Sequence, residues 1–292
     1  MLNGLQPNIN ETDYFKTCGF LYVAVGIKYL KEAEISVRSL KRFTKFPACL
    51  YTDIENYTNP LFDIIIKADV INGTYGNKIN GILKSPFYKT LYLDGDTFIC
   101  GHVDDLFDVL DLFDMSLMPD PLLHSYLFLL QRPDYKILYE KIVPEFQMAV
   151  ILFKKSQIVL QLLEEWLETH ARLNIVSDMA SFRDAYFRFV GRVSINPLPM
   201  EYNYNGTMTF SLVYDKVKII HEKIQERRDN LRLIMADFDK MERHAKRLNK
   251  YSFKRLIIPY FGPIPFYFSP YLIKRKIKKL LGVKRKVKDE SF

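Results

Sequence analysis

The stretch Thr90-Leu-Tyr-Leu-Asp-Gly-Asp96 is a run of apolar and uncharged residues that ends in two carboxylates separated by one glycine. A run that is apolar on both faces is typical of a buried strand in a parallel sheet. Ligands bind to open α/β sheets beyond the carboxyl ends of the strands. The sequence therefore predicts a polar site at Asp94 and Asp96, directly after a buried strand.

Two carboxylates in this arrangement can turn toward one hard cation without a clash between their side chains. Mn²⁺ or Mg²⁺ takes oxygen ligands and would bridge a diphosphate, neutralising the charge on a departing nucleoside diphosphate. The alternative is an ordinary surface turn, since Asp-Gly is a common turn pair. A phosphatase motif of the type strand-Asp-x-Asp-x-Thr/Val is excluded, because Phe98 occupies its last position.

Other apolar runs of strand length alternate with helical patterns along the chain. Strands are expected over residues 20–25, 49–52, 64–66, 90–93 and 148–153, and helices over 31–43, 78–83, 157–172 and 178–189. Ser177 is a suitable N-cap for the last of these helices. Strands that alternate with helices predict an α/β layer fold with a mainly parallel sheet.

The composition is that of one ordinary folded domain, and 292 residues can bury one sizeable core. The first 19 residues have no basic start, apolar run or small-residue cleavage site, so we expect no signal peptide. The three cysteines, Cys18, Cys49 and Cys100, are too few and too scattered for a disulfide framework. These features predict a cytoplasmic protein.

The basic character of the chain is concentrated near its C-terminus. Residues 241–292 hold 15 Lys or Arg against three acidic residues, whereas residues 1–240 hold 27 basic and 31 acidic ones. This split predicts a main domain, 1–240, and a basic, aromatic appendage, 241–292, with a partner of its own.

The appendage contains an uncharged stretch, residues 256–273, in which four prolines forbid a regular membrane-spanning helix. Nine basic residues follow between Lys274 and Lys288. Aromatic and basic residues together suit the headgroup layer of an anionic membrane, so we expect peripheral attachment. The alternatives are a solvated tail and nucleic-acid binding. No nucleic-acid reader fold accompanies the charge, and we expect no nucleic-acid partner.

Several stretches, taken in order, resemble the nucleotide-diphospho-sugar transferases related to glycosyltransferase family 8. They are residues 85–97, 144–151, 177–178, 198–203 and 217–221, and the similarity covers roughly residues 20–225. The resemblance implies the glycosyltransferase A fold, a single Rossmann-like, mainly parallel mixed sheet flanked by helices. It also implies a Mn²⁺-dependent site and makes residues 1–240 the catalytic domain.

The resemblance also implies roles for individual residues. Asp96 and His221 would be metal ligands, and Asp94 would bind the metal or the donor ribose. Tyr29 matches the position whose ring stacks on the base, and Lys78 matches a basic residue that contacts the diphosphate. The alternatives are a surface histidine at 221, a buried tyrosine at 29 and a solvated lysine at 78.

The sequence departs from the family pattern at three places. Gly26-Ile27-Lys28 stands where relatives have an acidic residue near the base, which leaves the base open. Gln147 replaces an asparagine, and Met179 replaces a glutamine beside the anomeric carbon, which leaves the stereochemical course open. Gln147 and Asp178 are the catalytic candidates. Asp178 would orient the sugar or acceptor or act as a base, or else be a carboxylate favoured by the helix dipole.

Two classes of function follow from these features. The first is a metal-dependent glycosyltransferase that moves a sugar from a nucleotide-diphosphate-sugar, a UDP-sugar, to a glycan or lipid-linked acceptor at the cytoplasmic membrane face. The second is a catalytically impaired relative that binds a nucleotide-sugar or a glycan. The intact residues Asp94, Asp96 and His221 favour the enzyme.

Overall fold

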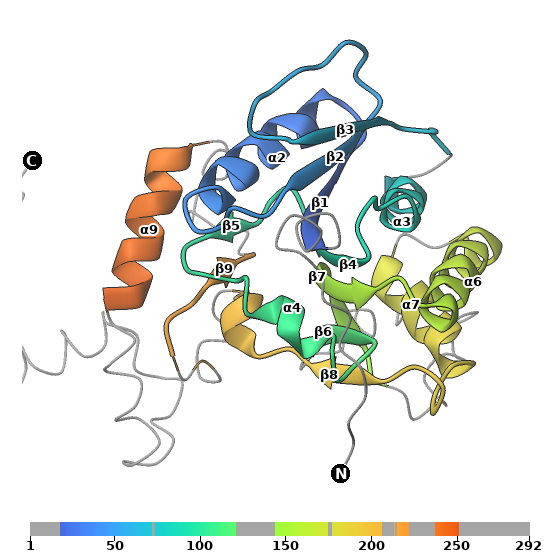
Figure 1. Cartoon of the computed structure of the whole chain (residues 1–292). Coiled ribbons are helices and arrows are strands. Elements are labelled where there is room, and N and C mark those ends of the chain that lie inside the picture. The colour runs from blue at the N-terminus through green and yellow to red at the C-terminus, as the bar shows by residue number, and fades with distance from the viewer. Residues whose placement is uncertain are drawn as a thin grey trace, which may run out of the picture.

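The computed structural model describes residues 18–71, 74–120, 144–174, 177–205, 213, 215–221 and 237–250 (Figure 1). The strands are β1 (Cys18–Ala24), β2 (Ala48–Thr52), β3 (Ile64–Lys67), β4 (Lys89–Leu93), β5 (Phe98–Ile99), β6 (Met115–Pro119), β7 (Phe146–Lys154), β8 (Ile195–Pro197) and β9 (Ile219–Ile220). The helices are α2 (Ile27–Leu40), α3 (Thr74–Leu83), α4 (Leu106–Val109), α6 (Gln157–Leu173), α7 (Asp178–Phe187), the 3-10 turn η2 (Met200–Tyr202) and α9 (Phe238–Lys250).

Seven strands form one mixed sheet in the order β3-β2-β1-β4-β7-β6-β8. The first four strands are mutually parallel, β7 is antiparallel to β4 and β6, and β8 is parallel to β6. The predicted α/β class and the mainly parallel mixed sheet are therefore confirmed. A second sheet, the antiparallel ribbon of β5 and β9, was not predicted, because strands of two residues are too short to show a period.

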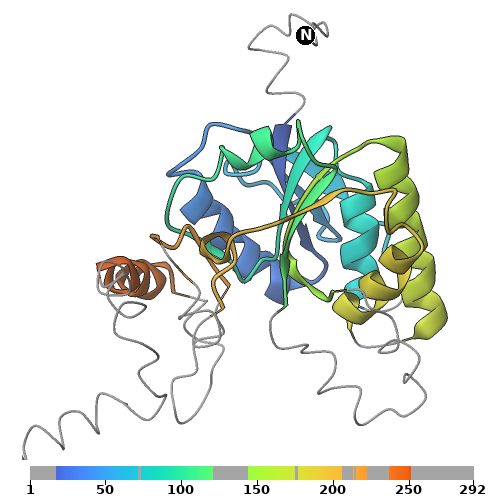
Figure 2. The same ribbon diagram turned by 90° about the horizontal axis from the view of Figure 1, so that it is seen from below.

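Helices cover both faces of the large sheet, with α2 on one side and α3, α6 and α7 on the other (Figure 2). Alternate residues of each strand point to opposite faces, so the core around the large sheet forms two clusters. A third cluster lies around the ribbon of β5 and β9. In β1, Phe20 and Tyr22 pack in the cluster with α2, whereas Leu21 packs in the cluster with the other three helices. Burial on both faces explains why the central strands read as continuous apolar runs.

The helix predicted over 31–43 begins earlier and runs from Ile27 to Leu40. Gly26, at φ 97°, turns the chain out of β1 in a conformation that favours glycine. Its N–H donates to Asp53 Oδ1 at 2.7 Å. At α7 the predicted cap is confirmed, since Ser177 Oγ accepts a hydrogen bond from Ala180 N.

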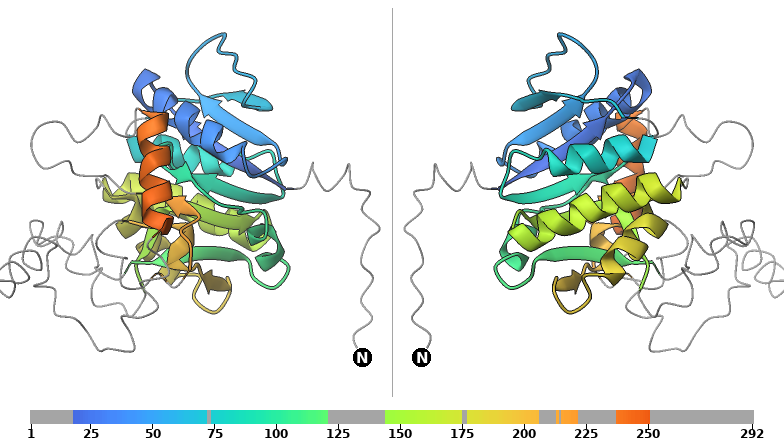
Figure 3. Two further views of the ribbon diagram at one scale, coloured as in Figure 1. Left: turned by 90° about the vertical axis from the view of Figure 1, so that its left-hand side faces the viewer. Right: turned by 90° about the vertical axis from the view of Figure 1, so that its right-hand side faces the viewer.

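Helix α9 lies against one side of the body (Figure 3). Its residues Met241 and Ala245 are buried, and Arg42 pairs with Glu242 at 2.9 Å. The predicted division after residue 240 falls inside this helix, so residues 241–250 pack with the body. The rest of the expected membrane-associating segment, 251–292, lies outside the described residues.

In the part of the chain that the structure describes, no helix has the length and apolarity to cross a bilayer.

Gly81 sets how closely α3 approaches the sheet. A Cβ atom at this position would lie 2.4 Å from Val23 Cγ2 and 2.9 Å from Tyr51 Cδ1. We expect Gly81→Ala to lower the free energy of unfolding by about 1–3 kcal/mol, because the overpacking outweighs the helix propensity gained. Denaturant titration measures this loss.

Val23→Ala is the matched second substitution, since it removes the methyl groups that the new Cβ would meet. The double variant should regain part of the stability that the two single variants lose together. A Gly81→Ala protein as stable as the wild type would contradict the close packing of α3.

Candidate active site

The site lies where the strand order reverses. From β1 the chain runs outward through β2 to β3, then returns through α3 to β4 on the other side of β1. The carboxyl ends of β1 and β4 are therefore neighbours from which the chain leaves in opposite directions, which is the usual ligand position in open α/β sheets. Gly26 follows β1 at this edge, and Asp94 follows β4.

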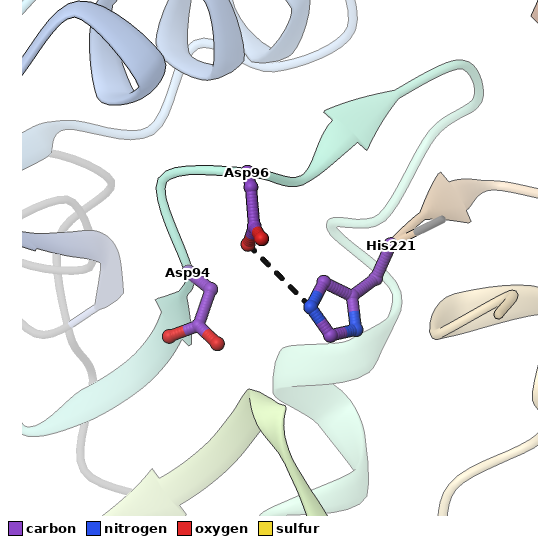
Figure 4. A group of neighbouring side chains, drawn as sticks. All are labelled: Asp94, Asp96 and His221. Carbon is purple, nitrogen blue, oxygen red and sulfur yellow. Dashed lines mark ion pairs between the residues drawn. The ribbon is translucent and has the colours of Figure 1, made fainter. Parts of the chain in front are cut away.

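Asp94, Asp96 and His221 face one another at this edge (Figure 4). Each offers one ligand atom, and these atoms lie within 4.8 Å of one another. His221 Nε2 is 3.4 Å from Asp96 Oδ1. The ribbon brings these groups together, because Phe98 of β5 pairs with Ile220 of β9, directly before His221.

Gly95 lets the two carboxylates lie close to α2. A Cβ atom on Gly95 would be 3.2 Å from the backbone N of Ala33 and 3.3 Å from the backbone O of Tyr29. Backbone atoms of a packed helix cannot move aside as a flexible side chain can, so this position favours glycine. The contact also places the first turn of α2 beside the Asp-Gly-Asp turn.

Lys78 of α3 connects Asp94 to Asp178. Its Nζ lies 3.0 Å from Asp94 Oδ1 and 2.7 Å from Asp178 Oδ2, and it donates to Met148 O at 2.6 Å. The hydroxyl of Tyr92 also donates to Asp94 Oδ1. Lys78 is buried, so it is not the solvated lysine of the alternative interpretation.

Burial and the surrounding charges together shift three pKa values. Burial lowers the pKa of Lys78, but Asp178 and Asp94 outweigh it, and the net pKa is well above the usual range. Burial and Asp94 raise the pKa of Tyr92. Burial lowers the pKa of His221, whereas Asp96 and Asp94 raise it, and the net effect is upward. Lys78 therefore stays cationic and Tyr92 stays a donor.

The donor atoms fit a divalent cation. Three carboxylates and one ammonium leave two negative charges among Asp94, Asp96, Asp178 and Lys78. Carboxylate oxygens and a neutral imidazole nitrogen are ligands for metals such as Mn²⁺. Ligand distances of roughly 2.0–2.4 Å place such atoms within about 5 Å of one another. The role of Asp94, Asp96 and His221 as ligands remains a prediction.

Asp178 lies at the start of α7 and is nearly buried. Its Oδ1 accepts from Met179 N at 2.9 Å, as expected for a carboxylate at a helix N-terminus. The indole N–H of Trp166 donates to Asp178 O at 3.1 Å and ties α6 to this turn. Asp178 thus serves the helix and also faces Lys78.

The other two predicted residues make different contacts. Gln147 of β7 is buried, and its Nε2 donates to Asp120 Oδ1 at 3.4 Å. Tyr29 is on the first turn of α2 with 37% of its surface exposed, and Lys28 Nζ lies 5.0 Å from its ring centroid. Tyr29 is therefore an exposed residue, in contrast to the buried-tyrosine alternative.

Sequence reasoning missed Tyr92, Trp166 and Asp120. Tyr92 could have been found, because it lies two residues before Asp94 and shares its side of the strand. Trp166 and Asp120 carry no such local signal, since their partners come from other elements.

No family model matches the sequence, and no curated protein matches it. The galactosyltransferase LgtC, in complex with donor and acceptor sugar analogues, is similar in structure. It is 15% identical over 81% of this chain and 95% of that chain, with a TM-score of 0.50. An active-site variant of LgtC has 14% identity, the same coverage and a TM-score of 0.52. The glycosyltransferase GlyE of Streptococcus pneumoniae TIGR4 has 15% identity over 82% of this chain and 64% of that chain, with a TM-score of 0.51.

The chain has the glycosyltransferase A fold. This confirms the fold that the resemblance implied. Identity this low shows the fold alone, so membership of glycosyltransferase family 8 remains a prediction. In a glycosyltransferase A fold, the cluster at the ends of β4 and β9 is a candidate active site.

Lys78→Met removes the charge between two carboxylates and leaves Asp94 and Asp178 facing each other without their counter-charge. Breaking a buried pair in this way costs about 3–5 kcal/mol of stability, and chemical denaturation measures it. Lys67→Met is the matched control, because it breaks an ion pair with Glu55 whose side chains are 75% and 74% exposed. Equal stability of the two variants would contradict a structural role for Lys78.

Proposed function

We propose that this chain is a metal-dependent glycosyltransferase that moves a sugar from a nucleotide-diphosphate-sugar, a UDP-sugar, to a glycan or glycolipid acceptor. The observation that carries the proposal is the Asp94-Asp96-His221 cluster at the reversal of strand order in a glycosyltransferase A fold. The solved neighbours LgtC and GlyE, by their names, are glycosyltransferases, and LgtC was solved with donor and acceptor sugar analogues.

The residues of the site would have separate roles. Asp94, Asp96 and His221 would hold Mn²⁺ or Mg²⁺, and such a cation supplies charge stabilisation to a leaving diphosphate. Lys78 fixes the orientation of Asp94 and adds positive charge at the same place. The exposed ring of Tyr29 offers a stacking surface for the donor base.

The acceptor side would use Asp178 and Gln147. Asp178 is held by Lys78, and an ion-paired carboxylate is well suited to accept hydrogen bonds from sugar hydroxyls. Gln147, beside Asp120, offers a second polar group at the start of β7. Both would orient a sugar by hydrogen bonds from rigid elements.

A second candidate is a catalytically impaired relative that binds a nucleotide-sugar or glycan without turnover. Ala149, which stands where the family pattern has a glycine, supports it together with Gln147 and Met179. The two candidates differ in one outcome. The enzyme releases nucleotide from its donor in the presence of Mn²⁺, whereas the binding module binds the donor and leaves it intact.

Asp96→Ala should abolish metal-dependent turnover and leave the fold intact, because its side chain is at the sheet edge and outside the core. We expect at least about a hundredfold loss of nucleotide release across a panel of nucleotide-sugars, together with weaker Mn²⁺ binding by calorimetry. Asp111→Ala, which removes a carboxylate that is 65% exposed, is the matched control. Full activity of folded Asp96→Ala, or activity unchanged by chelator, would refute the metal assignment.

We propose further that the enzyme attaches to the cytoplasmic face of an anionic membrane. The basic and aromatic composition of residues 251–292 supports this. Exposed basic residues on α9, directly before that segment, support it as well: Arg243, Arg247 and Lys250 recur at helical spacing. Met241 and Ala245 pack α9 on the body, so its charges would fix the orientation of the domain.

Replacing Arg243, Arg247 and Lys250 by Ala should weaken binding to anionic vesicles in flotation by roughly a hundredfold, at about 1 kcal/mol for each charge. The matched control replaces the exposed residues Lys67, Lys84 and Arg192, which removes the same charge elsewhere. Salt should weaken the electrostatic part. A wild-type protein that ignores anionic vesicles, or that binds nucleic acid more tightly at physiological salt, would overturn the proposal.

A further inference from the structure

The end of helix α9 holds the backbone of the segment that leads into β9. The side-chain amide of Asn249 accepts a hydrogen bond from Val217 N at 2.8 Å and donates one to Val217 O at 2.9 Å. Two residues that face each other in an antiparallel ladder exchange a pair of bonds in the same way. The amide of Asn249 therefore takes the place of a strand residue beside Val217.

Strand β9 needs support from outside the ribbon. The ribbon has only two residue pairs, and two short strands alone are marginally stable. Further bonds extend the pairing, since Cys100 N donates to Lys218 O and His221 N donates to Tyr204 O, each at 2.8 Å. Val217 is fully buried, so its N–H and C=O need partners inside the protein. Asn249 supplies both partners.

Helix α9 is itself fixed to the body at several points. Met241 and Ala245 are buried in the cluster around the ribbon. Arg42 pairs with Glu242 at 2.9 Å, and its guanidinium lies 5.1 Å from the ring centroid of Phe238. A helix held in this way can keep the amide at its end in a fixed position.

We infer that Asn249 is a positioning residue for His221. Its two hydrogen bonds fix Val217, and only three residues separate Val217 from His221. A shift of the chain at Val217 therefore changes how β9 presents His221 to Asp96. The inference rests on the proposed metal site, where the groups that orient a ligand also set the affinity for the metal.

Asn249→Leu tests the inference, because leucine has a similar size and removes both hydrogen bonds. Leucine also has the higher helix propensity, so an effect of this substitution does not come from a weaker α9. We expect the variant to fold and to bind Mn²⁺ about tenfold more weakly than the wild type by calorimetry. Asn249→Asp is the milder variant, since it keeps an oxygen that accepts from Val217 N, and it should lose less affinity.

Val159→Ala is the matched control. Val159 of α6 is fully buried in the cluster with α3 and α7, away from the ribbon. Its truncation lowers the stability of the fold by removing core packing. The affinity of the folded protein for Mn²⁺ should stay unchanged. A loss of affinity in both variants would show a general effect of lower stability and would overturn the inference.

A second measurement needs no metal. Amide hydrogen exchange reports local opening, and the N–H groups of Cys100 and His221 form bonds that hold β9. We expect both amides to exchange at least about tenfold faster in Asn249→Leu, while the amides of β4 keep their wild-type rates.

The two measurements separate the inference from the metal site. If the ribbon amides of Asn249→Leu exchange as in the wild type, or if its Mn²⁺ affinity is unchanged while His221→Ala loses binding, the inference is overturned and the metal site stands. If the wild type binds no Mn²⁺, the metal site is overturned, and exchange at the His221 amide alone decides whether Asn249 positions this residue.

Discussion

The ammonium of Lys78 connects three elements that are far apart in the sequence. It pairs with Asp94 after β4 and with Asp178 at the start of α7, and it also donates to a backbone carbonyl of β7. Attraction between these groups is strong because they are buried, and the same burial makes each charge costly without the others. The arrangement of α3 against the sheet is therefore tied to the arrangement of the acidic site. The stability of the fold and the arrangement of the candidate active site therefore depend on the same ammonium group.

Two glycines explain how several charged side chains fit at one edge of the sheet. Gly81 brings α3 close enough to β1 for Lys78 to reach the edge, and Gly95 brings the Asp-Gly-Asp turn against the backbone of α2. At both positions the absence of a side chain lets the glycine backbone lie close to its neighbours. The carboxylates are consequently held between two helices on opposite faces of the sheet, and their placement follows from packing.

The sequence predicted the parts whose signal is local. The apolar run before Asp94 marked β4 and the site, and a continuous stripe marked α6 from Gln157 onward. It could not predict the ribbon, whose strands have two residues each, or the early start of α2 at a glycine with positive φ. The pair of Lys78 and Asp178, 100 positions apart, depends on tertiary packing that no periodic pattern encodes.

The three candidate metal ligands are held in unequal ways. Asp94 is fixed by Lys78 and Tyr92, whereas His221 owes its place to the ribbon. The ribbon is in turn supported by α9. Asn249 accepts from Val217 N at 2.8 Å and donates to Val217 O at 2.9 Å, and Met241 packs in one cluster with Ile220. The helix that leads into the basic C-terminal segment thus supports the strand that carries His221. A displacement of α9 would therefore also displace His221.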